Sequence, residues 1–303
     1  MDKKGEIDSL SKIIKPDVGV ITNISYAHAK NFKNIKQIAL AKSEIIYHIK
    51  KDGAIVLNAD DQFYNFHKKI ALKRKLKIYS FSMTKKISDI KLNSIKKEGN
   101  KYKIFVDSNN EKIYFYVSSI FKNNIQNLLA ALTIIKIYRD INKLGKNIFY
   151  NYKIPEGRGD ISKIKINKKS IYLIDESYNS NPLSLNSAIK NFDMMKVNNS
   201  KKYLILGDML ELGVHSKKLH LEISSIINKS SINHVNVIGR HIVETYKNIN
   251  NNKKGLILKN KSQIIDLIKN SINNNDYLMI KGSNSTGLNK LTNALKARKI
   301  NAL

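Results

Sequence analysis

The chain has 303 residues, enough for two domains that each bury a core of their own. It contains no cysteine, which excludes disulfides, thiolate metal sites and a cysteine nucleophile. No apolar run approaches the ~20 residues that cross a bilayer, and the charged start is not followed by the apolar segment of a signal peptide. We therefore expect a cytoplasmic protein with no membrane partner.

The formal net charge of +30 would suggest a protein that binds nucleic acid or an anionic membrane. Only five of the 54 basic residues are arginine, however, and arginine is preferred for base readout and bidentate phosphate contacts. The lysines are scattered among abundant isoleucine and asparagine, a bias that A- and T-rich codons explain. We therefore expect no nucleic-acid partner, and a salt-dependent shift assay tests that alternative.

The first half of the chain mixes strands and helices. A strand–helix–strand order is predicted over residues 18–24, 38–49 and 54–57, with Ile38, Ala41, Ile45 and Ile49 at helical spacing. A β-hairpin follows over 101–106 and 112–117, turning at 107–110, and a helix over 124–138. The segment 151–160 joins a proline to two glycines, which is typical of a loop. We place the domain boundary there, between residues 1–152 and 153–303.

The second domain alternates strands with helices in a regular way. Its predicted strands lie near 170–175, 202–207, 234–238, 255–258 and 276–281. This alternation predicts an α/β fold with a Rossmann-like, doubly wound parallel sheet.

Three of these strands end in polar residues. Asp175 opens the run Asp-Glu-Ser-Tyr-Asn-Ser-Asn-Pro, Asp208 follows a second strand, and Lys281-Gly282-Ser283 follows a third. Each run alone is an ordinary turn. Because the carboxyl ends of parallel strands share one edge, where open α/β folds bind ligands, we expect Asp175, Asp208 and Lys281 to lie on one rim.

Candidate residues in the first domain have plain structural explanations. His28 follows a strand, where histidine is commonly a hydrogen-bonded loop residue, and the sequence Asn-Ala-Asp-Asp at 58–61 is a plausible turn. Lys42 lies beside the apolar positions of its helix, and a buried lysine is costly unless it is paired or chemically modified. The sequence has neither a G-x-x-x-x-G-K-[ST] phosphate loop nor a G-x-G-x-x-G dinucleotide motif.

Taken together, the motifs resemble the Mur ligase family, and within it the branch that adds D-alanyl-D-alanine. The resemblance runs over nearly the whole chain and includes Gly5-Glu6-Ile7, Lys15–Val18, Asn23-Ile24 with Ala27-His28, Ala41–Ile45, Leu57–Asp61, Asn124 with Asn127, Gly157–Gly159, Asp175–Pro182, Gly207–Gly213 and Lys281–Ser283. Singly these motifs are weak, but their order and spacing are specific.

The resemblance implies an ATP-dependent ligase of peptidoglycan synthesis, and hence a role in cell shape and division. ATP would phosphorylate the carboxylate of UDP-N-acetylmuramoyl-tripeptide, and the amine of D-alanyl-D-alanine would attack the acyl phosphate. The reaction needs Mg²⁺ and cationic groups around the phosphates.

The resemblance also implies roles for nine residues. Lys42, as a carbamate, and His28 match the catalytic magnesium site. Asn124, Asn127, Arg158 and Asp175 match ATP contacts, and Asn179, Asn181 and Lys281 match the dipeptide side.

Two departures accompany the resemblance. Asn123 stands where the family has a histidine, and Met1 falls just after a family segment that carries a magnesium-binding glutamate. That glutamate, the phosphate loop and the N-terminal UDP-substrate domain would lie upstream. The chain is thus expected to be a truncated central ATPase domain followed by the C-terminal domain. We expect residues 1–303 to form a monomer that is inactive without the upstream segments. The alternatives are a ligase of the folylpolyglutamate or cyanophycin synthetase type and a non-catalytic fragment that binds nucleotide or dipeptide.

Overall fold

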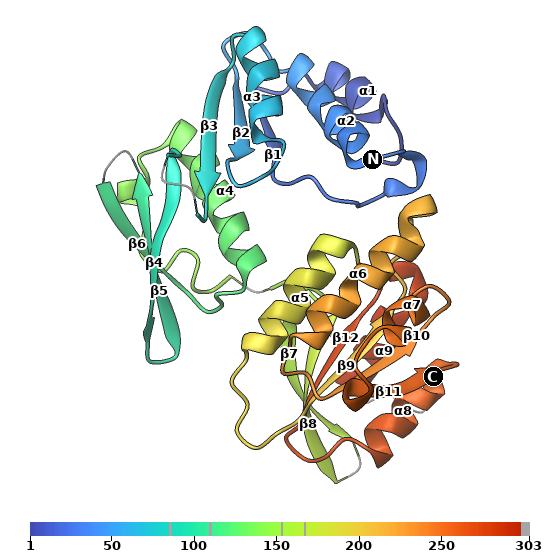
Figure 1. The fold of residues 1–303 in the computed structure, drawn as a ribbon. Helices are drawn as coiled ribbons and strands as arrows, with labels where there is room; N and C mark the ends of the chain where they lie inside the picture. The colour runs from blue at the N-terminus through green and yellow to red at the C-terminus, as the bar shows by residue number, and fades with distance from the viewer. Residues whose placement is uncertain (85–86, 109–110, 153, 167, 298–303) are drawn as a thin grey trace. The chain divides into compact units, whose positions relative to one another are not determined.

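The computed structural model describes residues 1–84, 87–108, 111–152, 154–166 and 168–297. The chain divides into two compact units (Figure 1). Unit 1 comprises Met1–Ser25 and Asn31–Lys153, and unit 2 comprises Tyr26–Lys30 and Ile154–Leu303. The short segment 26–30 thus belongs to unit 2, although the sequence suggested an uninterrupted first domain. None of the helices in the described residues is long and apolar enough to cross a membrane.

Unit 1 is built on one six-stranded sheet in the order β1-β2-β3-β4-β5-β6. Its strands are β1 (Val18–Ile21), β2 (Ala54–Asn58), β3 (Lys77–Ser82), β4 (Ile90–Glu98), β5 (Lys101–Ser108) and β6 (Glu111–Val117). The pairs from β1 to β4 are parallel, and the pairs from β4 to β6 are antiparallel. The helices are α1 (Glu6–Ile14), α2 (Ile35–Tyr47), α3 (Tyr64–Lys73) and α4 (Lys122–Tyr138).

The core of unit 1 explains this mixture. All five residues of β2 are buried, as expected for a central parallel strand. In the antiparallel part, β5 and β6 bury alternate residues, including Ile104 and Phe115, which belong to the same hydrophobic core as Leu129 of α4. The expected strands, two helices and hairpin of the first half are therefore present. The expected hairpin turn includes residues 109–110, which lie outside the described residues.

Four elements of unit 1 were not predicted: α1, α3, β3 and β4. The helix α1 begins after Gly5, whose φ of 93° favours glycine, and it leaves most of its apolar side chains exposed. The backbone N–H groups at its start donate hydrogen bonds to a side chain of another helix, α2. The Glu44 carboxylate, 7% exposed, accepts the backbone N–H groups of Gly5 and Asp8 at 2.9 and 3.1 Å. A tertiary cap of this kind leaves no local sequence signal.

Unit 2 contains a second six-stranded sheet in the order β11-β10-β9-β12-β8-β7. Its strands are β7 (Asp160–Ile166), β8 (Lys169–Glu176), β9 (Lys202–Gly207), β10 (His234–Ile238), β11 (Lys254–Leu258) and β12 (Tyr277–Lys281). The helices are α5 (Pro182–Met194), α6 (Ser216–Asn228), α7 (Val243–Lys247), α8 (Lys261–Asn270) and α9 (Leu288–Lys296). Five strands are parallel, as the β/α alternation predicted.

The edge strand β7 corrects the expectation of a wholly parallel sheet. It forms an antiparallel hairpin with β8 and buries Ile164 and Ile166 against it. Tyr203 and Ile205 of β9 share a core with α8 and α9, whereas the intervening residues of β9 are buried on the other face. The sheet is therefore covered on both sides, and its polar strand ends remain at the edge that forms the site.

Candidate functional site

The first group of predicted residues lies at the carboxyl ends of β1 and β2 in unit 1. Lys42 lies on α2, and its Nζ donates a hydrogen bond to the carbonyl oxygen of Asn23, 3.0 Å away and just beyond β1. Asp61 follows β2, and its Oδ2 accepts the backbone N–H of Ile24 at 2.7 Å. The Asp61 carboxylate thus fixes the loop after β1, which in turn holds the Lys42 amine.

Burial changes the chemistry of this amine. It lowers the pKa of Lys42, and the nearby Asp61 carboxylate opposes that shift. His67 of α3 is buried close by, with Nε2 3.1 Å from the carbonyl oxygen of Ala39, and burial lowers its pKa too. Burial therefore disfavours the charged forms of both side chains. Neither Asp61 nor His67 was among the predicted site residues. Asp61 carried a signal as an acid after a buried strand, whereas His67 had none.

Two of the predicted ATP contacts, Asn124 and Asn127, lie in the first turns of α4. Asn124 is half-buried and its Nδ2 donates to the Ser119 hydroxyl at 3.2 Å, while Asn127 is exposed. Asn123, which stands in place of the family histidine, is also exposed. The helix therefore presents amides at its N-terminal end, and their role as ATP contacts stays a prediction.

His28 lies in the segment that clusters with unit 2. Its Nδ1 is 2.6 Å from Oε2 of Glu211, a residue in the loop after β9. The His28 backbone has a φ of 55°, a conformation that side chains other than glycine rarely adopt. Magnesium binding by His28 and by Lys42 of unit 1 stays a prediction.

The polar strand ends of unit 2 lie on one rim, as the sequence predicted. Lys281, the last residue of β12, is in register with Glu176 of β8, and Asp175 precedes Glu176 on that strand. Asp208 directly follows β9, which pairs with the other side of β12. Asp175, Lys281 and Asp208 are thus at the carboxyl ends of three adjacent parallel strands.

Lys281 organises the turn after β8. Its ammonium is 1% exposed and donates to the Glu176 carbonyl oxygen at 3.4 Å, to Glu176 Oε2 at 3.2 Å and to the Asn179 carbonyl oxygen at 3.0 Å. Burial lowers the pKa of Lys281, an effect that the Glu176 carboxylate opposes. All three N–H groups are engaged within the turn, so the structure gives Lys281 a positioning role. Direct contact with a substrate stays a prediction.

The Gly157–Gly159 motif packs against the same turn. Gly157, with a φ of 73°, accepts the backbone N–H of Tyr178 at 3.0 Å, and a Cβ at this position would lie 2.9 Å from that nitrogen. The Arg158 guanidinium stacks on the Tyr178 ring, with its carbon 4.3 Å from the ring centroid. The Gly157–Gly159 motif and the Asp175–Pro182 run therefore pack together, and the Arg158 side chain lies exposed on their surface.

Asp175, a predicted ATP contact, has a buried carboxylate whose two oxygens both have partners within the protein. Its side chain is 1% exposed, and Oδ1 accepts the Ser177 hydroxyl at 2.5 Å and the Ser177 N–H at 3.0 Å. Its Oδ2 is 2.6 Å from Nζ of Lys296 on α9. The carboxylate thus holds the turn and pairs with a lysine that the sequence did not single out.

The two predicted dipeptide contacts differ from each other. Asn179 is exposed, and its side-chain oxygen accepts the neighbouring Ser180 N–H at 2.8 Å. Asn181 is the N-cap of α5, where it forms a capping box with Ser184 ahead of a helix that begins with Pro182. The side-chain oxygen of Asn181, Oδ1, accepts the Ser184 N–H at 2.9 Å and is therefore engaged with the helix. The order Asn-Pro-x-Ser is a sequence signal for this cap, and contact of Asn181 with the dipeptide stays a prediction.

Asp208 and Ser283 connect the remaining strand-end loops. The Asp208 carboxylate, 8% exposed, accepts the backbone N–H groups of Arg240, His241 and Ile242 at 2.8–3.0 Å. Ser283 donates its N–H to the Asp208 carbonyl oxygen, and its hydroxyl accepts the Leu210 N–H at 2.8 Å. The rim is thus rigidly cross-linked, and Asp208 is a structural cap.

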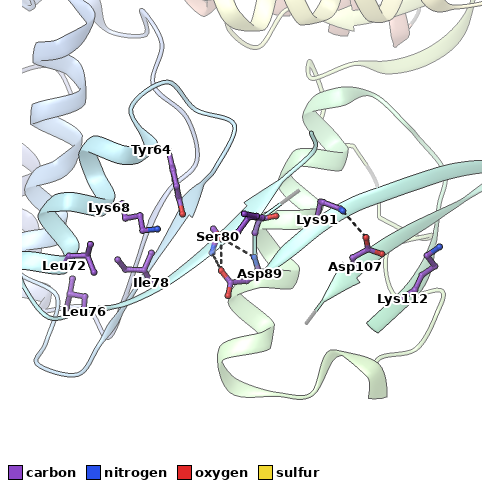
Figure 2. Close-up of a pocket in the computed structure, with 12 residues that line it drawn as sticks. Tyr64, Lys68, Leu72, Leu76, Ile78, Ser80, Asp89, Lys91, Asp107 and Lys112 are labelled. Carbon is purple, nitrogen blue, oxygen red and sulfur yellow. Dashed lines mark hydrogen bonds and ion pairs between the residues drawn. The ribbon is translucent and has the colours of Figure 1, made fainter. Parts of the chain in front are cut away.

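A cleft of about 850 Å³ in unit 1 has a different lining from these sites. Figure 2 shows Tyr64 and Lys68 of α3 on one side, and the ion pair between Lys91 and Asp107 on the other. Asp89 in this cleft holds the N–H and hydroxyl of Ser80, each at 2.7 Å. None of the predicted site residues lines it.

Comparison with known families covers both units. The family model of the Mur ligase middle domain matches residues 1–135. That of the Mur ligase glutamate ligase domain matches residues 162–284. The predicted fold class, a Mur ligase central domain followed by a Rossmann-like C-terminal domain, is confirmed by these matches.

The curated relatives include UDP-N-acetylmuramoyl-tripeptide–D-alanyl-D-alanine ligases. That of Rickettsia prowazekii is 30% identical over 96% of this chain and 64% of its own length. That of Buchnera aphidicola subsp. Baizongia pistaciae is 32% identical over 96% of this chain and 61% of its own length. The chain therefore spans less than two thirds of these relatives.

Solved structures show the same fold. MurF from Acinetobacter baumannii superposes with a TM-score of 0.83 at 23% identity, over 98% of this chain and 63% of that one. MurF ligase from Thermotoga maritima, crystallised with ADP, gives a TM-score of 0.82 at 21% identity, over 98% and 65%.

Proposed function

Because the chain belongs to the Mur ligase family, we propose that it carries the ATP- and amine-binding parts of a ligase that joins D-alanyl-D-alanine to UDP-N-acetylmuramoyl-tripeptide. The observation that carries the proposal is the enzyme name that similar curated relatives share. Those at 30–32% identity, matched over 96–97% of this chain, are all named as that ligase. The two motifs that resemble the D-alanyl-D-alanine-adding branch, Asp175–Pro182 and Gly207–Gly213, are also linked by hydrogen bonds through the Ser283 hydroxyl. Such a protein belongs in the cytoplasm, and we expect it to act as a monomer.

In the proposed reaction, a carboxylate oxygen of the UDP-linked tripeptide attacks the γ-phosphorus of ATP, and ADP leaves. The amine of D-alanyl-D-alanine then attacks the acyl carbon, the carbon–oxygen bond to phosphate breaks, and the amine loses a proton. This leaves an amide and inorganic phosphate. Arg158 offers a planar cation for a phosphate or for the developing charge, and Asn124 and Asn127 offer amides to the adenine edge.

The surroundings of Lys42 fit a magnesium site. Burial lowers the Lys42 pKa, and the neutral amine is the form that combines with CO₂, forming an N–C bond and releasing a proton. The resulting carbamate would be an anion near Asp61, and two neighbouring carboxylates favour a bound cation. Mg²⁺ bound there would neutralise the crowded phosphates.

The test is a chimera. The part of the Rickettsia relative that this chain does not match is joined to residues 1–303 in the relative's own order. We expect phosphate release that depends on ATP, Mg²⁺, UDP-N-acetylmuramoyl-tripeptide and D-alanyl-D-alanine together. A matched chimera with Lys42→Ala is the control for the magnesium site. A folded chimera that forms amides only with glutamate would instead favour the folylpolyglutamate type, and one that binds nucleotide without turnover would favour the non-catalytic fragment.

A further inference from the structure

We propose that Lys296, at the end of α9, is a positioning residue that clamps the Gly157–Gly159 turn and so sets the place of the Arg158 guanidinium. The functional consequence rests on the proposed function, in which Arg158 contacts the nucleotide. The clamp itself is a property of unit 2 alone.

The clamp is an ion-pair cluster across β7 and β8. Asp160 and Asp175 are directly opposed Cα partners in the antiparallel hairpin of these strands. Lys296 Nζ lies 2.5 Å from Asp160 Oδ2 and 2.6 Å from Asp175 Oδ2. One ammonium therefore bridges two carboxylates, each of which also has a second oxygen with its own partners.

The two carboxylates need this cation. Asp175 is almost fully buried, and opposed like charges on neighbouring strands destabilise a sheet. The paired carboxylates raise the pKa of Lys296 even though burial acts to lower it, so the ammonium stays charged at neutral pH. Removing the ammonium would leave two anions facing each other, one of them buried, and their separation would pull on both strands.

Two hydrogen bonds would transmit a displacement of these strands to the residues on either side of Arg158. The second oxygen of Asp160, Oδ1, accepts the Gly157 N–H at 2.7 Å, and the Asp175 carbonyl oxygen accepts the Gly159 N–H at 2.7 Å. Both neighbours of Arg158 are thus held by the two residues that Lys296 bridges. The guanidinium completes the arrangement by stacking on Tyr178.

Arginine side-chain NMR tests the clamp on the chain as it exists. The protein has only five arginines, so the Nε–H spectrum of the ¹⁵N-labelled chain is simple, and an Arg158→Lys variant assigns the relevant peak. All four described arginines are exposed, but only Arg158 among them lies over an aromatic ring, so stacking on Tyr178 should give its peak a ring-current shift that the peaks of Arg74, Arg139 and Arg240 lack. We expect Lys296→Met to move the Arg158 peak toward those of Arg74, Arg139 and Arg240, and Lys296→Arg to restore most of the shift.

Two variants complete the design. Lys290→Met makes the same change at an exposed position of the same helix, and the Arg158 peak should stay in place. If Lys296→Met does not fold, Asp160→Asn removes one charge of the cluster while leaving an oxygen for Gly157 N–H, and it should also displace the peak. A folded Lys296→Met or Asp160→Asn chain with an unmoved Arg158 peak would overturn the proposal.

The functional consequence is read separately in the active chimera. Lys296→Met should raise KM for ATP several-fold with a smaller change in kcat, and Lys296→Arg should recover it. An unchanged KM for ATP beside a displaced Arg158 peak would show that the clamp exists but that Arg158 does not contact the nucleotide, which overturns the consequence. If the chimera has no ligase activity at all, the proposed function fails, while the NMR result still decides the clamp.

Discussion

Replacing Asp208 tests whether the acid of the Gly207–Gly213 motif is structural. Its carboxylate accepts three backbone N–H groups, two on Oδ1 and one on Oδ2. Hydrogen bonds to charged groups contribute about 1.5–3 kcal/mol each, and unpaired buried donors cost a similar amount. Asp208→Asn keeps one acceptor oxygen but turns an amide against the Arg240 N–H. We expect a loss of about 3 kcal/mol in the free energy of unfolding for Asn and about 4–5 kcal/mol for Ala.

The assay is urea unfolding followed by pulsed hydrogen exchange, which reports peptides of unit 2 separately from those of unit 1. Peptides spanning residues 240–242 should also lose protection in the native state. Asp266→Asn, an exposed acid on α8, is the matched control and should change stability by less than about 0.5 kcal/mol. If Asp208→Asn were as stable as the control, the three hydrogen bonds to the Asp208 carboxylate would not stabilise unit 2. A direct chemical role for Asp208 would then have to be reconsidered.

Three further predictions concern chemistry and pH. In the active chimera, Lys42→Ala should abolish phosphate release and short carboxylic acids should partly restore it, because a free carboxylate replaces the carbamate; near-normal activity would show that Lys42 is merely half-buried packing. Residues 1–303 alone should release no phosphate at an enzymatic rate, because the sequence has no phosphate loop to hold the β- and γ-phosphates; ordinary turnover by this chain would refute the point. Burial lowers the pKa of His220, whose Nε2 accepts the Met209 N–H, so the unfolded chain binds a proton that folded unit 2 does not. Unit 2 should therefore lose stability as pH falls below about 6.5, and a urea midpoint that is equal at about pH 7.5 and about pH 5.5 would contradict this.

The sequence predicted the elements whose signals are local. The β/α alternation of unit 2 and the buried run of β2 follow from residue periodicity, and the polar ends of β8, β9 and β12 follow from topology. The edge strand β7 was missed because a hairpin before the first parallel strand leaves the alternation that follows unchanged.

The partners of the site residues were beyond sequence reasoning because they come from distant elements. Lys281 is fixed by Glu176, and Asp175 by Lys296 on α9, contacts between residues more than 100 positions apart. Asn181 shows the opposite case. Its local N-cap signal was present, but the family motif that contains it suggested a substrate contact. The cap is a structural role that the sequence shows locally, and the substrate contact of Asn181 stays a prediction.

The most direct measurement of the central claim is an amine competition with the active chimera. The enzyme receives ATP, Mg²⁺ and UDP-N-acetylmuramoyl-tripeptide with equal concentrations of D-alanyl-D-alanine, D-alanine, L-lysine and L-glutamate, and the products are identified by mass. We predict that the product carries the dipeptide almost exclusively. A product that carries a single amino acid would contradict the assignment of this chain to the D-alanyl-D-alanine-adding branch.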